Sequence, residues 1–126
     1  MLRRLSLLLA LGWMAYIFYL SSQHTLDIPS LFEYQDKVMH FTAYGVLGIF
    51  LLGATLLQPG GYTTAQVALA TVIASLYGIS DEFHQSFVPG RDPDVLDWLA
   101  DTSGALLAAL VLARISCSLF RSRQPG

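Results

Sequence analysis

The chain has 126 residues, of which 54% are hydrophobic and 13% are charged, whereas about 25% of a typical soluble protein is charged. The mean hydropathy of +0.53 and the scarcity of charges exclude a water-soluble globule, and the abundance of apolar residues excludes a disordered chain. A net charge of -2 argues against a nucleic-acid-binding protein, because such proteins are normally basic. The composition therefore predicts a membrane protein built as a single domain.

Four apolar stretches predict an all-α fold, a compact bundle of four transmembrane helices at residues 5–21, 38–57, 65–83 and 95–113. A helix needs about 20 residues to cross the hydrocarbon core. The second and fourth stretches reach this length, and the first and third need flanking polar residues. We interpret the first stretch as an uncleaved anchor rather than a signal peptide, because its apolar run is long and no small-residue cleavage motif follows it.

Positive charges gather at the two ends of the chain, in Arg3, Arg4, Arg114, Arg121 and Arg123. Because Lys and Arg accumulate on the cytoplasmic side of a membrane, both termini are predicted to be cytoplasmic in a multi-pass protein of the cell membrane. All nine acidic residues then fall on the outer side, with only Lys37 and Arg91 as cations.

The segments between the stretches carry turn and capping signals. After a turn at residues 27–29, Ser30 and Glu33 have the spacing of a capping box, which predicts a helix that starts near Ser30 and runs into the second span. Residues 58–61, with the sequence Gln-Pro-Gly-Gly, predict the loop after this span. Asp92, which is followed by proline, is predicted to cap the last helix.

Polar residues gather at three helix ends that this topology places on the outer side. Asp36, His40 and Tyr44 share one face of the second helix, since residues three or four apart are neighbours. The end of the third helix and the start of the fourth add Tyr77, Asp81, Glu82, His84, Gln85, Asp94, Asp97 and Asp101. We therefore expect these three ends to meet in one acidic, histidine-containing pocket.

The depth of two of these residues makes them candidates for function. Asp101 lies six residues beyond Val95, which corresponds to about 9 Å along the helix. An ionised side chain at this depth costs several kcal/mol unless it faces the bundle interior and is paired. His40 is also inside its apolar run. Ionisable residues within a membrane are functional candidates by default.

A purely structural interpretation competes with this one. The polar residues could form a hydrogen-bonded clamp between three helices, neutralised by Lys37 and Arg91, because polar side chains do join helices in membranes. Two cations do not neutralise nine carboxylates, however, and a clamp needs fewer acids. Glu33 and Lys37 are predicted to form an exposed i,i+4 pair, and small residues, Gly45, Gly48 and Gly104 with Ala108, are predicted to let helices approach closely.

Three motifs in order resemble the VanZ-like family of membrane proteins. Residues 36–44 (DKVMHFTAY) are similar to its DKxxHFxxY signature, and residues 77–87 contain the DExxQ motif with its aromatic neighbours. Arg91, Asp97 and Gly104 resemble the third motif. The resemblance covers residues 5–113 and includes the layout of four helices.

The resemblance implies a membrane protein of the cell envelope, since the founding member is associated with low-level teicoplanin resistance, and it implies no established reaction. Many members have asparagine at the position of Asp101, so the resemblance leaves open whether this residue is ionised. The motif residues are Asp36, Lys37, His40, Tyr44, Asp81, Glu82, Gln85, Arg91, Asp97 and Asp101.

Two functions from different classes follow, and we favour the first. A non-catalytic protein would bind a lipid-linked ligand, such as an envelope precursor, a glycopeptide, or a cationic ligand in the outer pocket, with membrane lipids around it. An intramembrane enzyme would act on a lipid head group, with catalytic candidates His40, Asp81, Glu82 and Asp97. Because carboxylates repel phosphate, the enzyme would need a divalent cation, with candidate ligands Asp36, Asp81, Glu82 and Asp97. Proton-coupled transport through His40 and Asp101 is a weaker third hypothesis.

Overall fold

The computed structural model describes residues 1–24 and 31–122, which contain four helices and no strand. The helices are α1 (Leu2–Ser21), α2 (Gln35–Gly53), α3 (Thr64–Gln85) and α4 (Val95–Arg121). The prediction of an all-α chain with four helices is confirmed. The predicted turn at residues 27–29, the predicted helix start at Ser30, and Arg123 lie outside the described residues.

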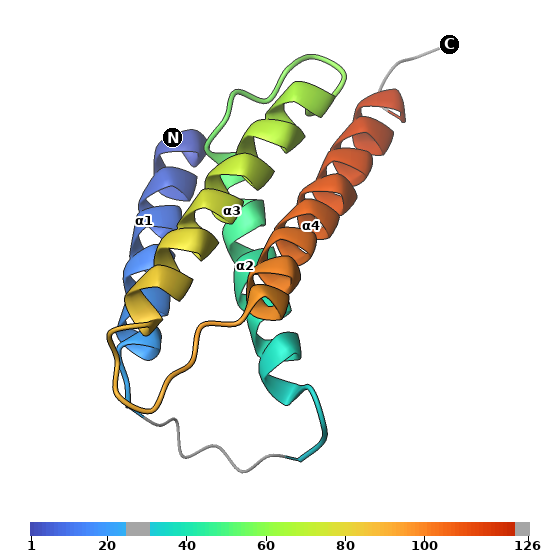
Figure 1. Cartoon of the computed structure of the whole chain (residues 1–126). Helices are drawn as coiled ribbons and strands as arrows, with labels where there is room; N and C mark the ends of the chain where they lie inside the picture. Colours follow the sequence, from blue (N-terminus) through green and yellow to red (C-terminus); the bar gives the residue numbers. More distant parts are fainter. Residues whose placement is uncertain (25–30, 123–126) are drawn as a thin grey trace.

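Successive helices run in opposite directions, so the described ends alternate between two ends of the bundle (Figure 1). The beginning of α1, the α2–α3 connection and the end of α4 lie at one end. The ends of α1 and α3 and the beginnings of α2 and α4 lie at the opposite end, which we call the polar end. This arrangement brings together the polar segments that the sequence separates.

Helix α2 is shorter at both ends than the sequence predicted. Residues 31–34 are not helical, and Tyr34, with φ of 65°, precedes the first turn in the left-handed conformation. Glu33 is therefore not part of this helix. At the other end α2 stops at Gly53 rather than at residue 57, and the carbonyl oxygen of Ala54 accepts a hydrogen bond from Arg3 Nε at 2.9 Å. A cation at a helix C-terminus is favourable because it faces the negative end of the helix dipole.

The starts of α3 and α4 are fixed by side-chain caps. Thr63 and Gln66 form a reciprocal capping box, in which each side chain accepts a hydrogen bond from the other residue's backbone N–H. At α4 the cap is Asp94, whose Oδ1 accepts from Leu96 N at 2.8 Å. The prediction of Asp92 as the cap was wrong by two residues, because the polypeptide stays extended until Asp94.

Small residues let α2 and α4 pack closely, as predicted. A Cβ atom added at Gly48 would lie 2.6 Å from the carbonyl oxygen of Ala105, and one added at Gly104 would collide with the carbonyl of Phe41. Gly45 faces Gly104 and Ala108 across the same contact. The buried apolar core contains Ala10, Ile17, Tyr44, Leu47, Leu51, Leu52, Val67, Ala70, Ala74, Ala105 and Ala109.

Two of the described helices, α1 and α4, are long and apolar enough to cross a membrane. Only 17% of the apolar window of each is buried inside the protein, which differs from the largely buried core helix of a soluble domain. The sequence predicted that the second and fourth apolar stretches are long enough to cross a membrane and that the first is slightly short. In the structure the first stretch forms a 20-residue helix, α1. Helix α2 ends four residues before the predicted limit at residue 57 and begins with polar residues.

Candidate functional site

Lys37 joins the first turns of α2 and α4 at the polar end. Its Nζ lies 2.6 Å from Asp94 Oδ2, 2.7 Å from Asp97 Oδ1 and 3.0 Å from Asp36 Oδ2. Burial alone would lower the pKa of Lys37, but the hydrogen bonds to these carboxylates raise it well above its usual value. The predicted pair of Lys37 with Glu33 was wrong, because Glu33 precedes the helix and Lys37 is directed toward α4.

His40 and Asp101 form a second contact between the same two helices, deeper in the bundle. His40 Nδ1 lies 2.9 Å from Asp101 Oδ1, and Asp101 is 0% exposed. Asp101 thus faces the bundle interior and is paired, which is the arrangement that makes an ionised side chain at its depth less costly. Its second oxygen, Oδ2, has no hydrogen-bond partner among the described residues.

Glu82 connects α3 to the start of α4. Its Oε2 accepts a hydrogen bond from Asp94 N at 2.8 Å, which places a carboxylate at the positive end of the α4 dipole. Glu82 is buried, and its Oε1 has no hydrogen-bond partner in the part of the chain that the structure describes. The three helix ends therefore meet, as the sequence predicted.

Asp81 and Tyr44 are buried beside this network. Asp81 Oδ2 accepts from Gln85 Nε2 at 3.3 Å, and the ring centroids of Tyr44 and Tyr77 are 6.1 Å apart. Asp81 Oδ1 and the Tyr44 hydroxyl are both buried without a hydrogen-bond partner among residues 1–24 and 31–122. Buried polar atoms in proteins are usually paired, so these two atoms are exceptions to that rule.

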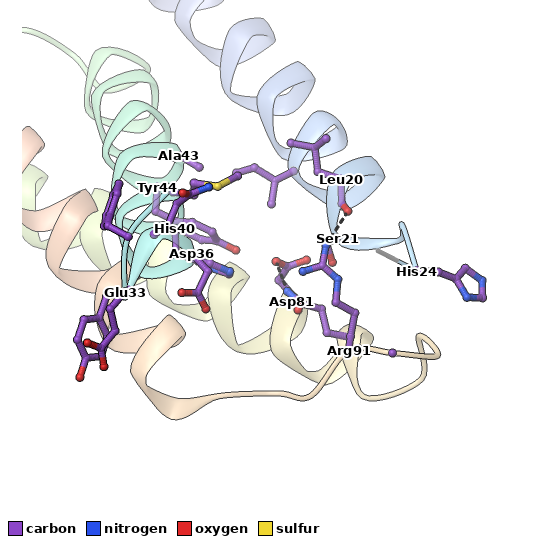
Figure 2. A pocket seen from close by; sticks show the side chains of 17 residues that line it. Leu20, Ser21, His24, Glu33, Asp36, His40, Ala43, Tyr44, Asp81 and Arg91 are labelled. Carbon is purple, nitrogen blue, oxygen red and sulfur yellow. Dashed lines mark hydrogen bonds between the residues drawn. The ribbon is translucent and has the colours of Figure 1, made fainter. Parts of the chain in front are cut away.

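A cavity of about 500 Å³ opens between α1, α2, α3 and the loop after α3, and we call it the main cavity. Figure 2 shows Tyr44, His40 and Asp81 directed toward it, with Arg91 approaching Asp81 from the loop. Its lining residues are Ile17, Leu20, Ser21, His24, Phe32, Glu33, Tyr34, Gln35, Asp36, Met39, His40, Ala43, Tyr44, Asp81, Gln85, Gly90 and Arg91.

Arg91 binds the end of α1 rather than the acidic residues. Its Nε donates to the carbonyl of Gln23 at 3.2 Å, and its Nη2 lies 3.5 Å from the carbonyl of Leu20. The sequence analysis had considered Arg91 as a partner of the carboxylates, and no ion pair between it and a described acid is present. Arg91 therefore lines the main cavity and connects the loop after α3 to the end of α1.

One group of side chains lies close enough together to hold a metal ion. His40, Glu82 and Asp101 each offer a ligand atom, and these atoms lie within 4.8 Å of one another. Of the four metal ligands suggested by the sequence, only Glu82 belongs to this group. Asp36 and Asp97 bind Lys37, and Asp81 lines the main cavity.

Sequence reasoning missed two serines of the bundle, Ser21 and Ser75, and wrongly placed His84 in the acidic pocket. Ser21 is buried, lines the main cavity, and its Oγ has no hydrogen-bond partner among the described residues. His84 is directed toward α1, with Nε2 3.0 Å from Ser22 Oγ and its ring stacked on Phe18 at 4.5 Å, so it is separate from His40. Ser75 accepts hydrogen bonds from Trp98 and Thr102. A single serine in an apolar helix gives no sequence signal for these roles.

Comparison with known proteins gives one result. The sequence model of the VanZ/LLP1 family matches residues 6–118. This range contains α2 and α3 completely, and it leaves out only the first residues of α1 and the last residues of α4. No curated protein and no solved structure matches the chain. The match covers most of the chain and agrees with the two apolar helices of a membrane protein. This chain belongs to the VanZ/LLP1 family.

Proposed function

We propose that this protein is a four-span membrane protein that binds an amphiphilic molecule with an amine or ammonium head group in the main cavity. The observation that carries the proposal is the Asp81 carboxylate. It is 4% exposed, it lines the cavity, and its Oδ1 has no hydrogen-bond partner among the described residues. A buried carboxylate oxygen without a donor is costly, and a cationic head group would supply both the donor and the charge.

The surrounding atoms suit the same head group. Ser21 Oγ and Tyr44 OH also line the main cavity and are also without a hydrogen-bond partner among the described residues. Hydroxyl oxygens accept hydrogen bonds, and an ammonium group has up to three donors. Together with Asp81, these oxygens form an acceptor set for one cationic nitrogen.

The charge of the lining favours a cation over a phosphate. Three carboxylates line the main cavity, those of Glu33, Asp36 and Asp81, and one cation, Arg91, stands beside them. Arg91 already donates to the backbone carbonyls of Leu20, in α1, and Gln23, just after it. An anionic head group would therefore meet net repulsion, which agrees with the expectation drawn from the sequence.

The rest of the lining is apolar and supports an amphiphilic ligand. Ile17, Leu20, Phe32, Met39 and Ala43 provide a surface for a hydrocarbon chain or an aromatic ring. Ligand pockets commonly combine such a surface with a few polar groups. An amine-bearing lipid fits this description. By resemblance to the family, we propose that binding contributes to low-level glycopeptide resistance.

The membrane arrangement in this proposal has four spans with cytoplasmic termini and the polar end outside. Exposed apolar side chains on α2 and α3, such as Ile49, Leu69 and Leu76, support lipid contact for the two helices that are less apolar overall. Both described chain ends lie at the end of the bundle opposite the main cavity (Figure 1). Arginines at those ends favour the cytoplasm.

Binding is tested with the full chain in nanodiscs, using dodecylammonium as the probe and dodecanol and dodecyl phosphate as comparators. We expect tryptophan fluorescence to report binding of dodecylammonium in preference to both comparators. Asp81→Asn should weaken that binding by roughly 10- to 100-fold, because it removes one charge-assisted hydrogen bond. Asp92→Asn is the matched control, since Asp92 is exposed and outside the cavity lining.

Equal binding of the three probes, or an Asp81→Asn protein that binds dodecylammonium as the wild type does, would overturn the proposal. The role in cells is tested by growth of a deletion strain on glycopeptides. Wild-type protein should restore growth and Asp81→Asn should not, at equal amounts of protein in the membrane. Full restoration by Asp81→Asn would contradict the role of the main cavity in resistance.

A further inference from the structure

We infer that His40, Glu82 and Asp101 form a binding site for one divalent transition-metal ion. The three residues come from α2, α3 and α4 and offer ligand atoms that lie within 4.8 Å of one another. This inference does not rest on the proposed amine-binding function. It concerns a different set of atoms, which shares only His40 with the lining of the main cavity.

Two unpaired oxygens point to a ligand at this place. Asp101 is 0% exposed and Glu82 is 8% exposed, yet Asp101 Oδ2 and Glu82 Oε1 have no hydrogen-bond partner in the described part of the chain. The other oxygen of each is used, by His40 Nδ1 and by the backbone N–H of Asp94 respectively. An unpaired carboxylate oxygen in the interior carries a large desolvation penalty, which a coordinated cation would remove.

His40 already places a ring nitrogen beside Asp101. Its Nδ1 lies 2.9 Å from Asp101 Oδ1. With metal–ligand bonds of about 2.1 Å, two atoms this close can share one ion. An ion bound between them would take the place of the proton in this contact, and the neutral imidazole would then carry its proton on Nε2.

The local charge balance also requires a cation. Four carboxylates are buried at the polar end, those of Asp81, Glu82, Asp97 and Asp101. Lys37 binds one of them, Asp97, and it also binds the more exposed carboxylates of Asp36 and Asp94. Because Lys37 is shared by three other carboxylates, the carboxylates of Glu82 and Asp101 have only His40 as a nearby cationic side chain. A divalent cation bound by His40, Glu82 and Asp101 would offset these two negative charges.

The donor set selects the kind of ion. One imidazole nitrogen with two carboxylates suits Mn²⁺, Fe²⁺ or Zn²⁺. Ca²⁺ takes six to eight oxygen ligands and Mg²⁺ prefers oxygen, so both should bind more weakly. His40 lines the main cavity, whereas Glu82 and Asp101 do not. The ion would therefore enter from the cavity and keep open positions on that side.

The experiment uses the full chain in detergent, stripped with a chelator and titrated with Mn²⁺ alone. We expect about one Mn²⁺ per chain, with a nitrogen coupling from imidazole in pulsed electron paramagnetic resonance. Glu82→Gln and Asp101→Asn should weaken binding by about 10- to 100-fold. His40→Gln should weaken binding and remove the nitrogen coupling. Asp92→Asn, which changes an exposed acid in the neighbouring loop, is the matched control.

A second variant keeps the test decisive if the substitutions prevent folding. The chain has three histidines, so His24→Gln combined with His84→Gln leaves His40 alone, and the nitrogen coupling must then survive. Absence of Mn²⁺ and Zn²⁺ binding by the wild type would overturn the inference. Loss of the coupling in the double variant, or its persistence in His40→Gln, would equally overturn it. None of these measurements contains an amine, so failure here is distinguishable from failure of the proposed function.

Discussion

At the residue scale, Lys37 has more consequence than its sequence context suggests. One ammonium group contacts three carboxylates on two helices, and the hydrogen bond from it lowers the pKa of Asp94. The charge of Lys37 is therefore retained at any physiological pH. The ammonium group of Lys37 thus carries a positive charge among the carboxylates of Asp36, Asp94 and Asp97 at the polar end.

Replacement of Lys37 by methionine should destabilise the bundle. Lys37→Met keeps most of the side-chain volume and leaves the buried Asp97 carboxylate without its cation, which costs roughly 1 to 3 kcal/mol. We expect a lower unfolding midpoint in detergent. Arg4→Met is the control, since Arg4 is exposed at the opposite end. An unchanged midpoint would show that the ion pairs contribute nothing to stability.

Gly48 makes a second prediction at this scale. Gly48→Ala would place a Cβ 2.6 Å from a backbone oxygen of α4, so the two helices must separate. We expect destabilisation by about 1 to 3 kcal/mol, as for other overpacked contacts. Gly12→Ala is the control, because nothing lies within 4 Å of its added Cβ. Equal unfolding midpoints for the two variants would contradict the close packing of α2 on α4.

At the element scale, the helices follow from apolar runs and their ends follow from local capping. Thr63 and Gln66 fix the start of α3 with two reciprocal hydrogen bonds. Thr63→Ala should therefore lower stability by about 1 kcal/mol, with Thr64→Ala, one residue inside the helix, as the control. The comparison is made by denaturant titration in detergent. A larger loss for Thr64→Ala would contradict the assignment of Thr63 as the cap.

The presence and order of the helices and the convergence of their polar ends were predictable. Apolar length and i,i+4 spacing are local, and an alternation of direction then places Asp36, Asp81 and Asp97 at one end. Helix limits were less predictable, because Tyr34 adopts a left-handed conformation and Asp94 gains two further contacts, with Lys37 and Glu82, that no local pattern contains.

The partners within the site were not predictable from sequence. Lys37 binds Asp94 and Asp97 rather than Glu33, and Arg91 binds α1 carbonyls rather than an acid. Both outcomes depend on how far each side chain reaches in the folded bundle. The burial of Ser21 depends on how α1 packs in the folded bundle, for which a lone serine gives no signal.

At the scale of the whole molecule, the proposed topology predicts which positions are reachable from outside the cell. In a Cys117→Ser background, which removes the single cysteine, Asp36→Cys and Asp92→Cys should react with an impermeant maleimide. Gln58→Cys, exposed in the α2–α3 connection, should react only after permeabilisation. Labelling of Asp36→Cys and Asp92→Cys from opposite sides would overturn the four-span proposal and the common outer end on which the main cavity depends.

Asp94 touches three helices at once: it caps α4 through its own carboxylate, binds Lys37 of α2, and donates its backbone N–H to Glu82 of α3. Asp94 thereby connects these three helices at one point. Among the described residues no ion pair holds α1 there, and Arg91 and His84 contact its end through hydrogen bonds to uncharged groups. If the main cavity widens, α1 is consequently the helix expected to move, while α2, α3 and α4 keep their positions relative to one another.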